Sequence, residues 1–576
     1  MSSEGLRASN SSDNVAIWSN TLGKASELFA RNQRISLVVS LLVLGVYLPA
    51  AGTIATGWDE GYTWKRIDAL EPWVRRWFQP GTSVGDQLSA ATLSRYWQFS
   101  REEPDGHGPF YALLSNAGHE LTHRLFGPPM SYRVGSVALF ALACGALFRC
   151  LSSRWGTGPA GVAVGLVAMQ PRIVPEVCFG VVDGPLLSLA ILTYCGFLGA
   201  IERPTFWRIM GFGVAAGCAM ATKLTGWVLL GPYVAFAVVF VNQRTLKVLG
   251  WGVLIAAATC LLLNVGWWPN PLDGLVRFFR SNLTRAETTH IPIYFLGRNF
   301  DFALPWYNTL VWTLVAVPPL TVVLGLIGLV GAGRRTLREW ASGQSDCDGE
   351  SRPTTATSAF VLAALVWAAI MVVRALPQAP GHDGVRQIII AFAYLAILAG
   401  GGVYLLQGWR RQRGAMMLGW IAVGASAFEC LAYHPFELSY YSPVVGGLPG
   451  AVKNFEPTYF WDSLTPEAIE WLNKNTPTGR SVLFVNNPEN WRYLHRWGTL
   501  KALPYSPEVH GTAPPIWFVL QHRTALLSAA DRRLLAEETP AFRVAKFGVP
   551  LLSIYSIQQY DRITEGRPQK VTRVGQ

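Results

Sequence analysis

Charged residues are scarce in this chain. Asp, Glu, Lys and Arg together make up 15% of its 576 residues, whereas hydrophobic residues make up 51%. Ordinary soluble domains carry about 25% charged residues, so the composition excludes an ordinary soluble chain. The uncharged stretches are long enough to cross a bilayer, which takes about 20 apolar residues. The sequence therefore indicates an integral membrane protein.

Three patterns that would indicate other classes of protein are missing from the sequence: a cysteine framework, an inverted repeat and a basic stripe. The eight cysteines show neither a disulfide framework nor a metal-binding spacing. No inverted internal repeat of the kind found in many transporters is visible. The net charge of +12 comes from basic residues that bracket short loops and not from a stripe on a soluble domain, so it does not indicate nucleic-acid binding.

Eleven apolar segments qualify as membrane spans, and we expect no cleaved signal peptide because polar residues 1–30 precede the first one. The two segments that flank Lys223 are short. The segments are Ile35–Ile54, Val134–Phe148, Gly158–Val174, Pro185–Ile201, Ile209–Thr222, Leu224–Val241, Val248–Trp268, Leu304–Gly331, Ala356–Val373, Ile388–Leu406 and Gly414–Tyr433.

Arginine and lysine recur at every second loop, which by the positive-inside rule predicts a cytoplasmic amino terminus and a periplasmic or lumenal opposite side. We expect the protein in the cell inner (plasma) membrane. Residues 1–30 are then a loosely ordered cytoplasmic tail, and the small polar stretch 341–355 is a cytoplasmic linker. The outer loop 56–131 is rich in aromatic residues, and its segments 72–78 and 94–100 are typical of interfacial helices. After residue 433 the pattern changes to short alternating strands and an amphipathic helix. We therefore expect residues 31–433 to form the transmembrane domain and residues 434–576 to form a small extracytoplasmic α/β domain.

Two acidic positions stand at outer ends of spans. Asp59 and Glu60 follow the first span within an aromatic and basic stretch, and Asp183 lies at the outer entrance of the fourth. A single carboxylate there most often marks only the water interface. Two carboxylates from separate loops on one face can instead divide catalytic work, one taking a proton from an attacking hydroxyl and the other orienting a substrate or a metal ion. We therefore expect a catalytic site at the outer rim.

Cations also occur on the outer side, where the positive-inside rule does not require them. Some can extend toward lipid headgroups. Lys223, with almost no loop around it, is placed at headgroup depth, where a lipid-linked phosphate would lie and where a cation would stabilise a phosphate leaving group. His107 lies in a loop that contains Gly and Pro, and a histidine in such a loop usually belongs to a turn without a role in catalysis. His382 and Asp383 could bind a metal ion, although two ligands alone are a weak signal.

Together these motifs resemble the GT-C glycosyltransferases of family 39, which are related to protein O-mannosyltransferases and the lipid A aminoarabinose transferase. An acidic residue after the first span matches Asp59-Glu60, and a His-Pro-Pro-like element matches His107-Gly108-Pro109 with one Pro replaced by Gly. Further matches are Arg133, Asp183-Gly-Pro185, Thr222-Lys223, Leu296-Gly297-Arg298, Asp383-Gly-Val-Arg386 and the run 435–441.

The resemblance implies a GT-C-like bundle of about 11 transmembrane helices. Its implied activity is inverting transfer of a sugar from a polyprenyl-phosphate donor to an acceptor hydroxyl on the outer face, with Asp59 as general base. By position it implies the site residues, which are Asp59, Glu60 and Asp183 for catalysis, Lys223, Arg298 and Arg386 for the donor phosphate, and His107, Tyr111, Arg133, His382 and Asp383 for substrate positioning.

Two other classes of function stay open. A lipid or solute transporter or flippase would place ionisable residues and broken helices near the bilayer midplane, whereas these spans are nearly free of internal charge. A non-catalytic assembly partner would keep the fold but not need Asp59. No complete metal ligand set is visible, so no cofactor is assigned and a divalent metal ion stays open. The expected partners are the polyprenyl-phosphate sugar, the bilayer and an acceptor protein, lipid or glycan. The sugar and the acceptor leave no signature in the sequence.

Overall fold

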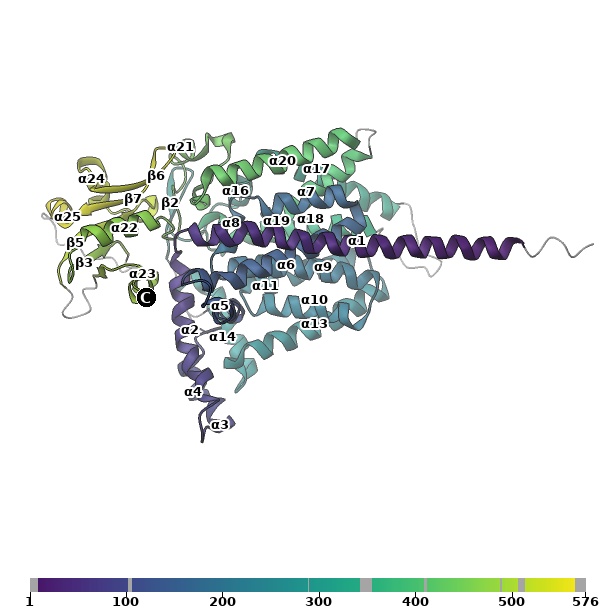
Figure 1. Cartoon of the computed structure of the whole chain (residues 1–576), viewed down its shortest axis with the longest axis horizontal. Helices are drawn as coiled ribbons and strands as arrows, with labels where there is room; N and C mark the ends of the chain where they lie inside the picture. The colour runs from purple at the N-terminus through teal and green to yellow at the C-terminus, as the bar shows by residue number, and fades with distance from the viewer. Residues whose placement is uncertain are drawn as a thin grey trace, which may run out of the picture.

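The computed structural model describes residues 9–101, 106–288, 290–341, 355–408, 412–486, 489–505 and 513–564. A bundle of helices fills the middle of the molecule, and a small domain with a β-sheet lies at one end of it (Figure 1). This end is called the outer end below. The predicted linker 341–355 lies, except for its first and last residue, outside the described residues.

The described residues contain eight helices that are long and apolar enough to cross a membrane, and three shorter apolar helices. They match the eleven predicted segments, which confirms a polytopic helical membrane protein. The long ones are α1 (Ser9–Thr53), α6 (Met130–Trp155), α9 (Asp183–Glu202), α13 (Gln243–Leu263), α17 (Pro319–Ala341), α18 (Thr355–Ala375), α19 (Ile389–Gln407) and α20 (Gln412–Tyr433). The shorter ones are α7 (Thr157–Ala168), α10 (Phe206–Met220), and α11 (Leu224–Val228) with α12 (Leu230–Val239).

The structure differs from the sequence-based prediction at two helices. The predicted span Leu304–Gly331 is divided into α16 (Asn308–Ala316) and α17, because Pro318 lacks an N–H and disfavours helical backbone at Val317, which is extended. Residues 9–30, predicted as a loosely ordered tail, continue α1 as helix. A helix that is already nucleated adds residues at little cost, so polar residues can extend it.

Helix α19 is the central helix of the bundle. Of its apolar window, 89% is buried within the protein. Small residues allow α17 to approach it closely: a Cβ on Gly328 would lie 2.0 Å from the Leu398 carbonyl oxygen. The 3-10 helix η2 (Gly384–Ile388) precedes α19 and carries Arg386. This packing fixes Arg386 at the outer end of the most buried helix.

Several short elements cover the outer end of the bundle. Helix α2 (Trp58–Arg76) runs across the bundle axis (Figure 1), with α3 (Val84–Gln87) and α4 (Ala90–Tyr96) at its far end. The predicted interfacial segments 72–78 and 94–100 overlap the ends of α2 and α4. Phe78 is exposed, whereas Trp97 and Phe99, predicted in an interfacial helix, lie beyond the end of α4 and are buried. The remaining elements here are α5 (Phe110–Thr122), α8 (Ile173–Cys178), α14 (Pro271–Leu283), α15 (Arg285–Thr288) and the antiparallel pair β1 (Ile293–Phe295) and β2 (Arg298–Phe300).

The predicted α/β domain is present at the outer end. Its five-stranded mixed sheet has the order β4-β3-β5-β7-β6. Strand β5 (Pro515–Gln521) alternates: Phe518 and Leu520 pack in a cluster with residues of α24 and α25, whereas Val519 belongs to the core that continues into the bundle. The other elements are α21 (Gly447–Ala451), α22 (Pro466–Asn475), β3 (Ser481–Phe484), α23 (Glu489–Arg496), β4 (Leu503–Pro504), α24 (Ala529–Glu537), β6 (Phe542–Lys546), β7 (Val549–Ser556) and α25 (Ile557–Thr564).

Candidate active site

Asp59 and Glu60 lie in the first turn of α2, just after α1 ends. The backbone N–H of Gly57 donates to Glu60 Oε2 at 2.9 Å, which caps the helix. The positive end of the helix dipole also favours acidic residues at this position. Two acidic residues at the outer end of the first span therefore follow directly from the way α2 begins.

Arg386 is the centre of a cluster of charged residues at the outer end. Its Nη1 lies 2.6 Å from Asp59 Oδ2 and 3.3 Å from Asp383 Oδ2, and its Nε lies 2.8 Å from Asp183 Oδ2. The Phe460 ring centroid lies 4.9 Å from its guanidinium carbon. A guanidinium shared by three carboxylates brings together α2, α9 and η2, which are far apart in the sequence.

The ion pairs of Arg386 are close contacts of charge and not aligned hydrogen bonds. Nε and Nη1 have no hydrogen bond of good geometry within the described residues, although both are buried. Strong guanidinium binding of a carboxylate or phosphate uses two parallel N–H···O bonds. Arg386 therefore keeps N–H donors for a further anion.

Lys223 joins the cluster on the far side of Asp183. Its Nζ lies 2.9 Å from Asp183 Oδ1 and 3.3 Å from Gln387 Oε1. It stands in the short extended turn between α10 and α11. Burial lowers the pKa of Lys223 to about 8, and the positive charges of Arg386 and Arg374 lower it as well. Asp183 raises this pKa but does not offset the other effects.

The three carboxylates of the cluster differ in accessibility. The Asp183 side chain is 4% exposed, and each of its oxygens faces a cation. The Asp383 side chain is 9% exposed, whereas that of Asp59 is 32% exposed. An incoming substrate can therefore reach Asp59 from water, while Asp183 holds Lys223 and Arg386 in place.

His382 and Asp383 precede η2. Asp383 has a left-handed backbone with φ of 58°. Burial would raise its pKa, but Arg386 and Arg523 lower it to about 2. Burial and the nearby Arg285 and Arg386 lower the pKa of His382 to about 3. His382 is thus a neutral imidazole in a basic environment.

Glu60 and Arg133 do not have the predicted surroundings of catalytic and substrate-positioning residues. Arg133 Nη2 and Nε lie 2.6 and 2.8 Å from the two Glu60 oxygens, and both side chains are at most 1% exposed. Arg133 also donates to the backbone oxygens of Ala51, Ile54 and Ala55. The pair therefore fastens the end of α1 to α2. This geometry gives no support to the catalytic role predicted for Glu60 or to the substrate-positioning role predicted for Arg133.

His107 lies beside the cluster, and Gly108 explains why. The Gly108 N–H donates to the Thr222 carbonyl at 3.1 Å, and a Cβ at this position would lie 2.1 Å from the Ala221 carbonyl oxygen. Proline, which lacks the N–H, could not make this contact. Burial, then Arg285 and Lys223, lower the pKa of His107 well below its usual value. Nearby, Tyr111 accepts a hydrogen bond from Arg66 at 2.8 Å.

Arg298 is not brought to the cluster. It lies on strand β2, where its side chain is exposed. No ion pair links it to Asp59, Asp183 or Asp383 within the part of the chain that the structure describes. The predicted role in phosphate binding therefore has no geometric support.

Four residues that sequence reasoning missed surround the cluster. Gln387 contacts Lys223, Phe460 stacks on Arg386, and Arg523 Nη2 lies 3.2 Å from Asp383 Oδ1. Glu176 is 1% exposed, and neither of its carboxyl oxygens has a hydrogen-bond partner among the described residues. Burial, then Asp183, raise the pKa of Glu176 well above its usual value. No motif marks these positions.

The carboxylates of the cluster do not form a metal site of the usual kind. Among the described residues, no group of three His, Cys, Asp or Glu side chains is arranged to hold a metal ion. Asp183 and Asp383 already face cations of the protein.

Three comparisons with known proteins were made. Residues 106–268 match the family model described as dolichyl-phosphate-mannose-protein mannosyltransferase. No curated protein matches the chain. Among solved structures, ArnT from Cupriavidus metallidurans bound to undecaprenyl phosphate is similar with a TM-score of 0.47 and 14% identity, over 90% of this chain and 97% of that chain. AglB, the archaeal oligosaccharyltransferase from Archaeoglobus fulgidus, in complex with an inhibitory peptide and a dolichol-phosphate, has a TM-score of 0.43 and 12% identity over 81% of this chain and 64% of that chain.

At these TM-scores the likeness to solved structures carries no residue role over to this chain. The family match confirms the predicted resemblance, and its range contains His107, Asp183 and Lys223. Asp59 and Arg386 lie outside that range and join its residues in the folded cluster. The chain is a multi-pass membrane protein whose residues 106–268 are similar to the dolichyl-phosphate-mannose-protein mannosyltransferases.

Proposed function

We propose that this protein is a glycosyltransferase that moves a sugar from a polyprenyl-phosphate donor to an acceptor hydroxyl on the outer face, with inversion at the anomeric carbon. The observation that carries the proposal is the cluster in which Arg386 joins Asp59 to Asp183, and Asp183 joins Arg386 to Lys223. The cluster combines an accessible carboxylate, Asp59, with two cations, Arg386 and Lys223, at the outer end of the bundle.

Asp59 is the general base in this proposal. The acceptor oxygen forms a bond to the anomeric carbon while the bond from that carbon to the phosphate oxygen breaks. The acceptor proton goes to Asp59, and the leaving polyprenyl phosphate keeps the electron pair. Asp59 suits this role because its side chain is the most exposed of the three cluster carboxylates.

Arg386 and Lys223 bind the donor phosphate. A phosphate that leaves as an anion needs no acid to protonate it when two cations hold its charge. Arg386 offers N–H donors that are not aligned with its carboxylate neighbours. The donor's lipid tail remains in the bilayer. Helix α2, which carries Asp59 in its first turn, lies across the outer end of the bundle (Figure 1).

We further propose that the chain lies in the inner (plasma) membrane with its amino terminus in the cytoplasm. The distribution of Lys and Arg in the short loops supports this orientation, which places the cluster and the sheet domain on the extracytoplasmic side. A transporter or flippase is the second candidate that the sequence left open. The ion-paired cluster at one end of the bundle favours the enzyme, because a transporter would need ionisable groups near the midplane.

The test is transfer by purified full-length protein. A panel of polyprenyl-phosphate sugars is offered, and glycosylated products are identified by mass spectrometry. Asp59→Asn should lower the transfer rate by about 100- to 10,000-fold while polyprenyl phosphate still binds. Glu71→Gln, an exposed carboxylate on the same helix, is the matched control and should behave as wild type. Unchanged transfer by Asp59→Asn would remove Asp59 from the mechanism.

A further inference from the structure

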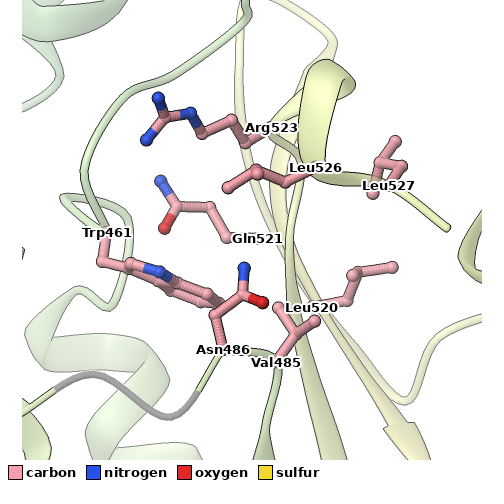
Figure 2. A pocket seen from close by; sticks show the side chains of 8 residues that line it. All are labelled: Trp461, Val485, Asn486, Leu520, Gln521, Arg523, Leu526 and Leu527. Carbon is pink, nitrogen blue, oxygen red and sulfur yellow. The ribbon is translucent and has the colours of Figure 1, made fainter. Parts of the chain in front are cut away.

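The end of strand β5 in the outer domain reaches the charged cluster through two separate side chains. Gln521 is the last residue of β5, and Arg523 follows two residues later. Figure 2 shows both side chains beside Trp461 at the edge of one pocket. Each side chain leads to Arg386 by its own chain of contacts.

The first route runs through Asp383. Arg523 Nη2 lies 3.2 Å from Asp383 Oδ1, while Asp383 Oδ2 lies 3.3 Å from Arg386 Nη1. Both partners of the Arg523–Asp383 pair are at most 10% exposed. Asp383 is therefore balanced between two guanidinium groups. Without Arg523 its charge would attract Arg386 alone and draw it from Asp59 and Asp183.

The second route runs through the loop before α22. Gln521 Nε2 donates to the Tyr459 carbonyl at 2.7 Å and lies 3.3 Å from Asp462 Oδ1. Phe460 lies between these residues, with its ring over the Arg386 guanidinium. Its backbone carbonyl accepts a hydrogen bond from the Trp58 N–H at 2.9 Å. Trp58 is the first residue of α2 and precedes Asp59. Gln521 thus holds the loop that contacts both Arg386 and the start of α2.

Both routes pass a residue with a left-handed backbone. Asp383 and Trp461 each have φ of 58°. A residue other than glycine keeps such a conformation only where its surroundings determine it strongly. The contacts from Arg523 and Gln521 are part of those surroundings.

We propose that Arg523 and Gln521 are positioning residues through which the outer domain sets the place of Arg386 relative to Asp59 and Asp183. The outer domain is thus a part of the active site and not only an appended module. This inference rests on the proposed function for the role of Arg386 in phosphate binding.

The test measures two quantities on full-length protein: the affinity for undecaprenyl phosphate, and the kcat and KM for transfer. Arg523→Met should weaken undecaprenyl phosphate binding and raise the donor KM by roughly tenfold. Arg523→Lys, which keeps the charge, should restore most of the loss. Arg533→Met removes an exposed arginine of the same domain and should match wild type.

A double variant keeps the test decisive if Arg523→Met folds poorly. Asp383→Asn combined with Arg523→Met leaves no unpaired buried charge and should bind undecaprenyl phosphate better than Arg523→Met alone. If Arg523 only stabilised the fold, the two substitutions would lower the melting temperature additively and would leave the affinity for undecaprenyl phosphate unchanged. Wild-type affinity and KM in Arg523→Met would overturn the inference. Wild-type protein that binds undecaprenyl phosphate but transfers no sugar would overturn the proposed function alone, and absence of both would overturn the two together.

Discussion

If Lys223 binds the donor phosphate as proposed, its buried ammonium should make donor binding depend on pH. Its pKa of about 8 means that the protonated fraction falls from about 90% at pH 7 to about 10% at pH 9, since one unit is a tenfold change in the ratio of the two forms. The charged form exists below the pKa and is lost above it. If only the ammonium binds phosphate, kcat/KM for the donor should fall about tenfold per pH unit above 8.

Lys223→Arg tests the cause of this loss. Arginine stays protonated throughout this range, so the alkaline fall in kcat/KM should move up by more than about one unit even if the variant is slower overall. Lys65→Arg changes an exposed lysine on α2 and should leave the profile unchanged. Steady-state transfer from pH 6 to 10 with one polyprenyl-phosphate sugar measures the effect. A flat wild-type profile, or the same alkaline fall in Lys223→Arg, would refute the reasoning.

Three further changes have defined expectations. Arg133→Met leaves Glu60 buried without its partner and should cost about 3–5 kcal/mol of stability, seen as a lower melting temperature in detergent; an unchanged melting temperature would contradict it. Gly108→Ala places a Cβ against the Ala221 carbonyl and should reduce kcat/KM by about 100-fold, whereas wild-type kinetics would show that the two loops separate freely. Glu176→Leu removes a buried carboxyl that has no hydrogen bond to any residue the structure describes and should raise the melting temperature; a fall would mean that the carboxyl has a partner.

Hydropathy alone was sufficient to predict the bundle. Each apolar segment must satisfy its own backbone hydrogen bonds within lipid, so the apolar runs and the helices coincide closely. The break at Pro318 was the informative exception, since a proline within an apolar run interrupts the helix without changing its hydropathy. In the outer domain, alternation predicted short strands, and the structure has them as β3, β5, β6 and β7.

The site was only partly readable from the sequence. Asp59, Asp183 and Lys223 stood out because charges at the outer ends of spans are unusual, and the structure brings them together through Arg386. The sequence could not separate Asp59 from Glu60. One faces the cluster and the other turns inward to Arg133, and this difference follows from the direction in which α2 leaves the bundle.

Other contributors were invisible because they act across long sequence separations. Gln387, Phe460 and Arg523 have no motif of their own. Gln387 meets Lys223 across the bundle, whereas the contacts of Phe460 and Arg523 depend on how the outer domain meets the bundle. Arg298 shows the opposite case, since a motif position can have an exposed side chain. Spacing along a chain does not reveal which charges share a cavity.

The pairing of Arg523 with Asp383 has a practical consequence for any attempt to reduce this protein to a minimal form. A truncation after Tyr433 would keep every transmembrane helix and all the residues that touch Lys223. It would nevertheless strip one guanidinium from Asp383 and the aromatic cover from Arg386. Engineering that exchanges the carboxyl-terminal module between homologues would therefore exchange part of the electrostatics of the reaction centre as well.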